Sequence, residues 1–261
     1  MDAKTLGARL AAARRFLAFS GGIDSTALAL LTPDATPVFT DTHWEFPHVY
    51  EHIQRFEDVT GRAVVRLTHP DWPGGLPEYI RHHAFMPGHG ARYCTRVFKI
   101  ETYNLWIASR LPAEMLVGLR YDEPEDRRIG NLTDLPGLTI RYPLREMRMT
   151  RLDCVEVCAQ HGLLPRYPVY AARGGCVGCF YKRKAEVQAM CALVPGVMDG
   201  LQALEEEVQD ERGKYAYLFP NVGASIREVR SQPLLFSPDE VYASASQTSD
   251  MGQVCGLFCN R

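Results

Sequence analysis

Near the start of the chain, one short segment combines small residues, hydroxyls and a carboxylate in a pattern typical of an anion-binding loop. An apolar run over residues 15–19 predicts a buried strand before it, and apolar residues at helical spacing over 23–31 predict a helix after it. Free backbone N–H groups and the dipole at a helix N-terminus favour a bound anion, and paired glycines let an oxygen approach the backbone. We therefore predict a phosphate site made by Ser20, Gly21, Gly22, Ile23, Asp24, Ser25 and Thr26.

Asp24 adds a negative charge to the first turn of this predicted helix, where a phosphate needs donors. A carboxylate is useful there if it holds a magnesium ion that bridges the phosphates. The sequence has no Gly-x-x-x-x-Gly-Lys-Ser/Thr, and no Gly-x-Gly-x-x-Gly follows the first strand. The alternative, an ordinary strand-to-helix turn with a serine cap, leaves Asp24 without a role.

Strand and helix patterns alternate along the first half of the chain. Strands are predicted at 15–19, 36–41, 63–67 and 114–118, and helices at 23–31, 46–60 and 95–110, with a long, partly irregular insertion at 69–91. This alternation predicts an α/β fold with a parallel twisted sheet and helices on both faces. Ligands of such sheets bind at the carboxyl ends of the strands. We therefore expect the loop at Ser20, Asp41, Thr42, Gly118 and Arg120 to meet in one cleft.

After residue 143 the pattern becomes mainly helical, with helices predicted at 150–161, 182–193 and 197–209. Thr150 is a suitable N-cap for the first of these, with Asp153 at the third position after it. We predict three parts: a nucleotide-binding α/β domain over 1–143, a helical region with a cysteine metal site over 144–231, and a loosely ordered tail over 232–261.

Cys176 and Cys179 form a Cys-x-x-Cys turn with glycines around it. Glycines let both thiolates face one ion, so the turn predicts a metal site. Thiolate ligands alone do not separate an iron–sulfur cluster from zinc, and buried thiols unrelated to any metal are the remaining alternative. Cys154 and Cys158 lie four positions apart on a predicted helix among apolar neighbours, so we expect them in the core.

The overall charge is balanced, with 29 basic and 31 acidic residues in 261. This balance excludes attraction of the whole chain to nucleic acid or anionic lipid, so such a partner would need a local patch. Basic clusters at 145–151 and 182–184 are expected to be solvated helix faces, with contacts to a nucleic-acid backbone as the alternative. No apolar run reaches membrane-spanning length, and the start does not read as a secretory signal. With eight cysteines, these features predict a cytoplasmic protein.

Residues 20–25 match all six positions of a Ser-Gly-Gly-x-Asp-Ser loop, so the chain resembles the PP-loop ATP pyrophosphatases. Segments 39–47, 117–127 and 142–179 are similar to the phosphoadenosine-phosphosulfate reductase family within that group, with His43 in place of the usual glycine. The resemblance implies an adenine nucleotide alpha hydrolase-like fold, magnesium, and cleavage of ATP between its α and β phosphates. It implies catalytic roles for Asp24, Ser25, Asp41 and Arg120, and nucleotide contacts that include Thr42, Gly118 and Arg127.

Iron–sulfur members of the resembled family pair an upstream cysteine site with a downstream Cys-x-x-Cys. The resemblance therefore implies a [4Fe–4S] cluster held by Cys94, Cys176 and Cys179, with Zn²⁺ as the alternative metal and Cys191 as one candidate for a fourth ligand. Those reductases have adjacent cysteines upstream, whereas this chain has Tyr93-Cys94. The fourth ligand is consequently open between Cys191, Cys255, Cys259, a histidine and none.

Three functions fit these features. The intact loop favours an ATP-dependent sulfurtransferase that adenylates a nucleic-acid or small-molecule acceptor. A phosphosulfate reductase that releases sulfite is the second, although Val254 and Phe258 replace the Glu and His of the reductases' Glu-Cys-Gly-Leu-His tail. The third is a nucleotide-binding subunit of a DNA-modification complex. We expect a nucleotide substrate and a nucleic-acid or sulfur-donor protein partner, and the oligomeric state is left open.

Overall fold

The computed structural model of the chain describes residues 14–123, 135–171, 175–212, 217–232 and 237. Five parallel strands form one sheet in the order β3-β2-β1-β4-β5. They are β1 (Arg14–Ala18), β2 (Thr36–Thr40), β3 (Val65–Leu67), β4 (Ala113–Leu116) and β5 (Leu138–Arg141). The first four strands confirm the predicted ones to within two residues at each end, and β5 was not predicted.

The strand order places β1 at the centre of the sheet. The chain moves outward from β1 to β2 and β3, then crosses to the other side of β1 to form β4 and β5. The order of strands therefore reverses between β1 and β4, and such a switch point opens a crevice at the carboxyl ends of the two strands.

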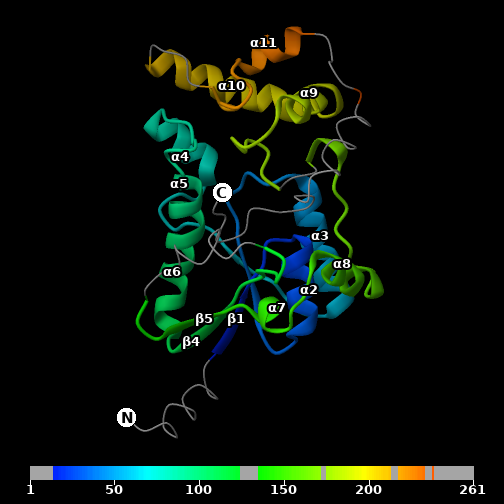
Figure 1. The fold of residues 1–261 in the computed structure, drawn as a ribbon. Coiled ribbons are helices and arrows are strands. Elements are labelled where there is room, and N and C mark those ends of the chain that lie inside the picture. The colour runs from blue at the N-terminus through cyan, green and yellow to red at the C-terminus, as the bar shows by residue number, and fades with distance from the viewer. Residues whose placement is uncertain (1–13, 124–134, 172–174, 213–216, 233–236, 238–261) are drawn as a thin grey trace, which may run out of the picture.

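Helices cover both faces of the sheet, as predicted (Figure 1). On one face, α2 (Ile23–Leu31), α3 (Pro47–Thr60) and α8 (Arg151–Gln160) share a core with Leu17, and this core contains the buried Cys154 and Cys158. On the other face, α6 (Thr102–Ile107) packs beside Phe16 and Ala18. Successive residues of β1 therefore face opposite layers, which is the alternation that a strand buried on both sides requires.

The helix that leads into α6 is irregular. It begins as α5 (Tyr93–Thr95), continues as a π-helical segment over Arg96–Glu101, and ends after α6 in a 3₁₀ turn at Ala108–Arg110. This run confirms the predicted helix at 95–110. Single π-helical turns inside α-helices occur frequently at functional sites.

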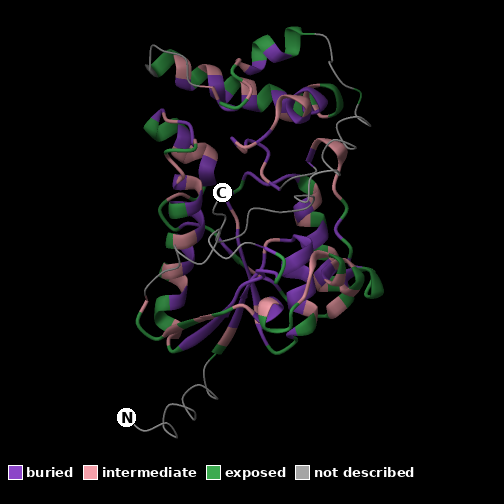
Figure 2. Ribbon diagram, in the orientation of Figure 1, coloured by how far each residue is buried: buried purple, intermediate pink, exposed green. Residues whose placement is uncertain are grey.

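A third core joins the insertion to the second half of the chain. It contains buried apolar residues of α4 (Gly75–His83), α9 (Lys184–Leu193), α10 (Pro195–Arg212) and α11 (Ile226–Ser231), and the buried parts of these ribbons are purple in Figure 2. The short helices are α7 (Pro143–Glu146) and a 3₁₀ turn at Val169–Ala171. The predicted helices at 150–161, 182–193 and 197–209 are confirmed, and α8 has the expected Thr150–Asp153 capping box. The insertion contains α4, which was not predicted.

No individual helix among the described residues is long and apolar enough to cross a membrane. The adjacent helices α9 and α10 meet the length and composition criteria only as a pair, bent by 119°.

Candidate functional site

The Ser20 loop leaves the carboxyl end of β1 and enters α2. Gly21 has φ +71°, a conformation that glycine adopts without strain, and Gly22 is the N-cap of α2 without a side-chain capping bond. Inside the loop, the Ser25 hydroxyl donates to the Gly22 carbonyl at 3.0 Å and accepts from the Ser20 backbone N–H at 3.2 Å. The loop is thus held closed by its own serines around a helix N-terminus, the arrangement predicted for a phosphate site.

The loop after β4 lies directly against this helix start. A Cβ atom on Gly118 would lie 3.3 Å from the backbone carbonyl carbon and oxygen of Asp24 and from the Ser25 nitrogen. A side chain at position 118 would therefore press on the first turn of α2. The two segments were predicted to meet in one cleft, and they meet at the switch point between β1 and β4.

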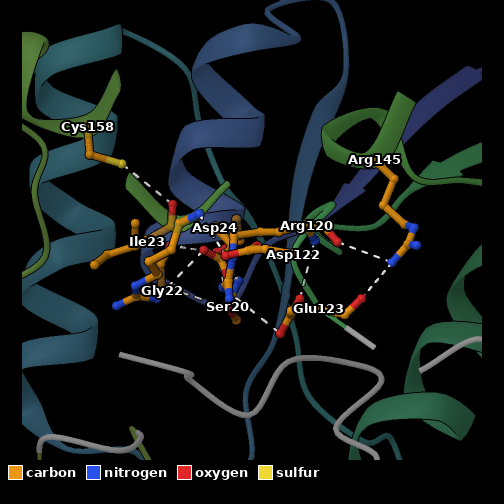
Figure 3. A network of polar contacts seen from close by, with 11 residues as sticks. Ser20, Gly22, Ile23, Asp24, Arg120, Asp122, Glu123, Arg145 and Cys158 are labelled. Atoms are coloured by element: carbon orange, nitrogen blue, oxygen red, sulfur yellow. Dashed lines mark hydrogen bonds and ion pairs between the residues drawn. The ribbon is translucent and has the colours of Figure 1, made fainter. Parts of the chain in front are cut away.

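Arg120 connects the two segments by a buried ion pair. Its guanidinium donates to the Asp24 carboxylate at 2.6 Å and to Asp122 at 2.9 Å, and the exposed fractions of Arg120 and Asp24 are 4% and 8% (Figure 3). Burial lowers the pKa of Arg120, but the nearby carboxylates of Asp24, Glu123 and Asp122 outweigh this effect and raise it. Arg120 is therefore charged at every accessible pH.

The backbone around Arg120 is fixed by further charged groups. Glu123 accepts from the Arg120 backbone N–H at 3.2 Å, and Arg145 donates to the carbonyls of Arg120 and Glu123 at 3.3 and 2.8 Å (Figure 3). A second arginine, Arg151 of α8, lies 3.7 Å from the Asp24 carboxylate. Arg145 and Arg151, which belong to a predicted basic cluster, thus have partners inside the protein.

This geometry bears on the predicted magnesium ligand. The charge of Asp24 is compensated by Arg120 and Arg151 in this arrangement. A magnesium ion bound by Asp24 would compete with the two guanidinium groups for the carboxylate oxygens. The ion pair between Asp24 and Arg120 had not been anticipated from the sequence.

Asp41 and Thr42 follow β2 at the same edge of the sheet. The Asp41 carboxylate accepts from the His43 backbone N–H and the Tyr50 hydroxyl, both at 2.8 Å. His43 has φ +56°, which explains why glycine suits this position in the resembled family. The buried Thr42 hydroxyl donates to Glu45 at 3.2 Å, and both residues line the cavity of the cysteines described below.

The remaining loop residues predicted to contact a nucleotide have other surroundings. The Thr26 side chain is fully buried and lies 2.9 Å from His52, so its hydroxyl serves the packing of α2 on α3. The Ile23 side chain is buried in the same core, and its carbonyl accepts a weak hydrogen bond from Cys158. Burial, with help from Arg55, lowers the pKa of His52 to about 4, so the imidazole is neutral at neutral pH. Arg127 lies outside the described residues.

Three of the predicted metal ligands line one small cavity. Cys94, Cys176 and Cys179 surround a space of about 30 Å³, and Thr42, Glu45 and Lys99 also line it. Burial raises the pKa of the Cys176 thiol well above its usual value, and it raises the pKa of Glu45. We refer to this space as the cysteine pocket. Because Thr42 lines it, the cysteine pocket adjoins the edge of the sheet where the Ser20 loop lies.

Glycine at position 178 is required by the wall of this pocket. A Cβ there would lie 2.4 Å from the Trp44 ring, far inside van der Waals contact. The backbone of Glu45 pairs with Cys176 in an antiparallel bridge, and Val177 donates to the Trp44 carbonyl at 2.9 Å. The Cys-x-x-Cys turn is thereby attached to the segment that follows β2.

Cys191, one candidate for the fourth ligand, is not among the residues that line the cysteine pocket. It lies on α9, half-buried, and burial raises the pKa of its thiol. Among the residues that the structure describes, no three Cys, His, Asp or Glu side chains stand at ligand spacing. Cys255 and Cys259 lie outside the described residues. The donor chemistry of the pocket nevertheless fits a thiolate-bound metal or cluster, because three thiols from two distant segments share it.

Glu45 and Lys99 were missed in the sequence. Both are buried, and Lys99 lies in the π-helical segment that follows Cys94. Buried charged residues are rare unless paired, but their burial is not visible from composition alone. For the basic cluster at 182–184, contacts to a nucleic-acid backbone are the alternative role. Lys182 is not available for such a contact, because it is buried with its ammonium group over the Phe46 ring.

Comparisons with known proteins agree with the resemblance drawn from the motifs. Residues 14–141 match the family described as phosphoadenosine phosphosulfate reductase domain. No curated protein sequence matches the chain. One similar solved structure is a phosphoadenylyl-sulfate (PAPS) reductase from Candida auris in a phosphate complex, at 12% identity and a TM-score of 0.42, over 57% of this chain and 72% of that one.

Proposed function

We propose that this chain is an ATP pyrophosphatase that adenylates an acceptor for sulfur transfer, and the match of residues 14–141 to the phosphoadenosine phosphosulfate reductase family supports a nucleotide-binding role. The observation that carries the proposal is the Ser20 loop at the switch point of the sheet, with Gly118 pressed against the start of α2. All six residues of the loop have the pattern typical of ATP pyrophosphatases.

In this proposal the first-turn amide groups of α2 and the Arg120 guanidinium hold the phosphates of ATP. Asp24 and Asp41, which follow neighbouring strands, would hold a magnesium ion, and that ion supplies charge neutralisation when it is bound. When ATP and magnesium bind, Arg120 would leave Asp24 and bind a phosphate, and Asp24 would bind the metal instead of Arg120. The two buried charges therefore stay compensated with and without the ligand.

The reaction proposed for this site has two displacement steps. An acceptor oxygen attacks the α-phosphorus and forms a phosphorus–oxygen bond, and pyrophosphate leaves with the bonding electron pair. A sulfur nucleophile then attacks the acceptor carbon, and AMP leaves with the oxygen. The chain's own contribution is alignment of the reacting groups and stabilisation of the developing charge by Arg120 and the backbone amides.

We further propose that Cys94, Cys176 and Cys179 hold a [4Fe–4S] cluster, with Zn²⁺ as the alternative. Such a cluster, when bound, supplies an iron with an open coordination position for a sulfur ligand. Thiolates must be formed before they bind metal, and the nearby buried Lys99 lowers the pKa of Cys176 against the stronger effect of burial. We also propose a cytoplasmic location, where thiols are kept reduced for metals or chemistry.

Calorimetry with Mg-ATP and an assay of pyrophosphate release test the proposal. We expect wild-type protein to bind ATP, and Ser25→Ala to weaken binding because the loop loses its internal hydrogen bonds. Ser231→Ala is the matched control, since Ser231 is exposed at the end of α11. The proposal is wrong if anaerobically purified protein binds no ATP. Binding without turnover until a partner is added would instead support a subunit of a DNA-modification complex.

A phosphosulfate reductase is the second candidate, because the matching family takes its description from that activity. It would release sulfite from an adenylyl sulfate and would need no ATP. Supplying each substrate separately and measuring pyrophosphate and sulfite distinguishes the two functions.

A further inference from the structure

A second, larger cavity lies between α4 and the helix that begins with α5, which are neighbours in Figure 1. Its volume is about 530 Å³, and it is open to solvent. This is in the range of about 300–1,000 Å³ that small-molecule sites occupy. The side chains that line it are Tyr79, His83, Phe85, Arg92, Tyr93 and Arg96. We refer to it as the aromatic pocket.

The rings of this pocket are already arranged as a stacking surface. Tyr79 stacks on His83 with ring centroids 4.0 Å apart, and Tyr93 lies 4.9 Å from Tyr79 and 6.0 Å from Phe85. His83 Nδ1 lies 3.0 Å from the Tyr79 carbonyl, which fixes the imidazole against the tyrosine ring. Flat, preordered rings beside an open cavity suit a planar ligand such as a nucleobase.

The charged side chains that line the aromatic pocket are all basic. Arg92 and Arg96 line it, and none of its lining residues is an aspartate or a glutamate. The Arg96 guanidinium is exposed and makes no ion pair with any side chain of the described segments. The exposed Arg96 guanidinium therefore favours an anion, and guanidinium groups are well suited to phosphate.

The aromatic pocket also adjoins the cysteine pocket. Arg92 lines both cavities, and Tyr93 and Cys94, adjacent in α5, line one each. A chain of nucleotides with one base in the aromatic pocket would therefore have its neighbouring nucleotide close to the three thiols. A free mononucleotide would fill the aromatic pocket without reaching them.

From this geometry we propose that the aromatic pocket binds a base and an adjacent phosphate of a single-stranded nucleic acid, which is the acceptor. The identification as acceptor rests on the proposed function, whereas the binding does not. The chain carries a net charge of −2, so this local patch, and not the overall charge, provides the attraction.

Fluorescence anisotropy with labelled single-stranded DNA and RNA oligonucleotides tests the proposal on the full chain at several salt concentrations. We expect Arg96→Ala to weaken binding about fivefold or more and to reduce the salt slope by about 0.7, the loss of one phosphate contact. His83→Ala removes one stacking face and should weaken binding by about fivefold to hundredfold. Arg227→Ala is the matched control, because Arg227 is an exposed arginine on the distant helix α11.

Mg-ATP binding, measured in the same variants, separates this proposal from the proposed function. Oligonucleotide binding that depends on Arg96 and His83 supports the proposal even if ATP does not bind. Absence of oligonucleotide binding by a protein that binds ATP overturns it, as does equal weakening by Arg96→Ala and Arg227→Ala. A further contrary result is that AMP binds with the same affinity as the oligonucleotide and loses the same affinity in Arg96→Ala. The occupant would then be a mononucleotide, and this result also contradicts the proposal.

Discussion

Removal of Arg120 should destabilise the fold because it leaves a buried carboxylate without its closest partner. In Arg120→Met the chain would lose the 2.6 Å ion pair with Asp24 in a place where both residues are buried. Breaking a buried pair from one side costs about 3–5 kcal/mol. Because Arg151 remains 3.7 Å from the Asp24 carboxylate, we expect the lower end, about 3 kcal/mol.

Thermal unfolding followed by circular dichroism gives the measurement. A loss of about 3 kcal/mol in a chain of this size corresponds to a fall of about 6–12 °C in Tm. Arg96→Met is the matched control, because this exposed arginine has no ion pair in the described structure and its loss should change stability by less than about 0.5 kcal/mol.

The double variant Asp24→Asn/Arg120→Met tests the cause. If Arg120→Met is destabilising because the Asp24 charge is left uncompensated, removing that charge should restore a large part of the lost free energy of unfolding. The double variant should then differ from the sum of the two single variants by about 0.5–3 kcal/mol. Two results would refute the reasoning. One is a Tm of Arg120→Met equal to that of Arg96→Met, and the other is strict additivity in the double variant.

Two further predictions concern packing and pH. Gly178→Ala should destabilise the chain by about 1–3 kcal/mol, since its methyl group would overlap the Trp44 ring, whereas Gly196→Ala has open space and should be neutral or stabilising in urea unfolding. Wild-type stability should fall as the pH drops from about 6.5 to about 4, because burial lowers the pKa of His52 to about 4 and the unfolded chain takes up the proton first. When unfolding is measured at a series of pH values, the free energy of unfolding of His52→Gln should change less steeply with pH than that of the wild type, by at most about 1.4 kcal/mol per pH unit.

The elements that position the Ser20 loop were predictable because their signals are local. The apolar run of β1, the glycine turn and the helical spacing of α2 lie within twenty residues. The strand β5 was missed because its residues Leu138–Arg141 alternate between half-buried and exposed at the edge of the sheet, so no continuous apolar run marks it. The helix α4 was missed because glycine and proline at its start and histidines at its end are typical of loops.

The residue types at the candidate site could be singled out from the sequence, but the partners of these residues could not. Residue types identified Asp24 and Arg120 as functional candidates, yet they lie 96 positions apart, and their ion pair depends on the topology that puts β4 next to β1. The same holds for Glu45 and Lys99, whose burial beside Cys176 results from the packing of the Cys-x-x-Cys turn on the segment after β2. Pairwise contacts of this kind are set by the tertiary fold and leave no periodic trace in the sequence.

The segment that follows β2 connects the two sites directly. Asp41 belongs to the edge of the sheet where the Ser20 loop lies, and Glu45, four residues later, lines the cysteine pocket. Between them, His43 in a left-handed conformation turns the chain, and its N–H donates back to Asp41 while Thr42 donates to Glu45. Such a turn has little freedom, because both of its ends are held by buried hydrogen bonds or by the strand ladder. A rigid connection of this length keeps the proposed adenylation and sulfur chemistry beside one another, which is the spatial condition that transfer to a single acceptor requires.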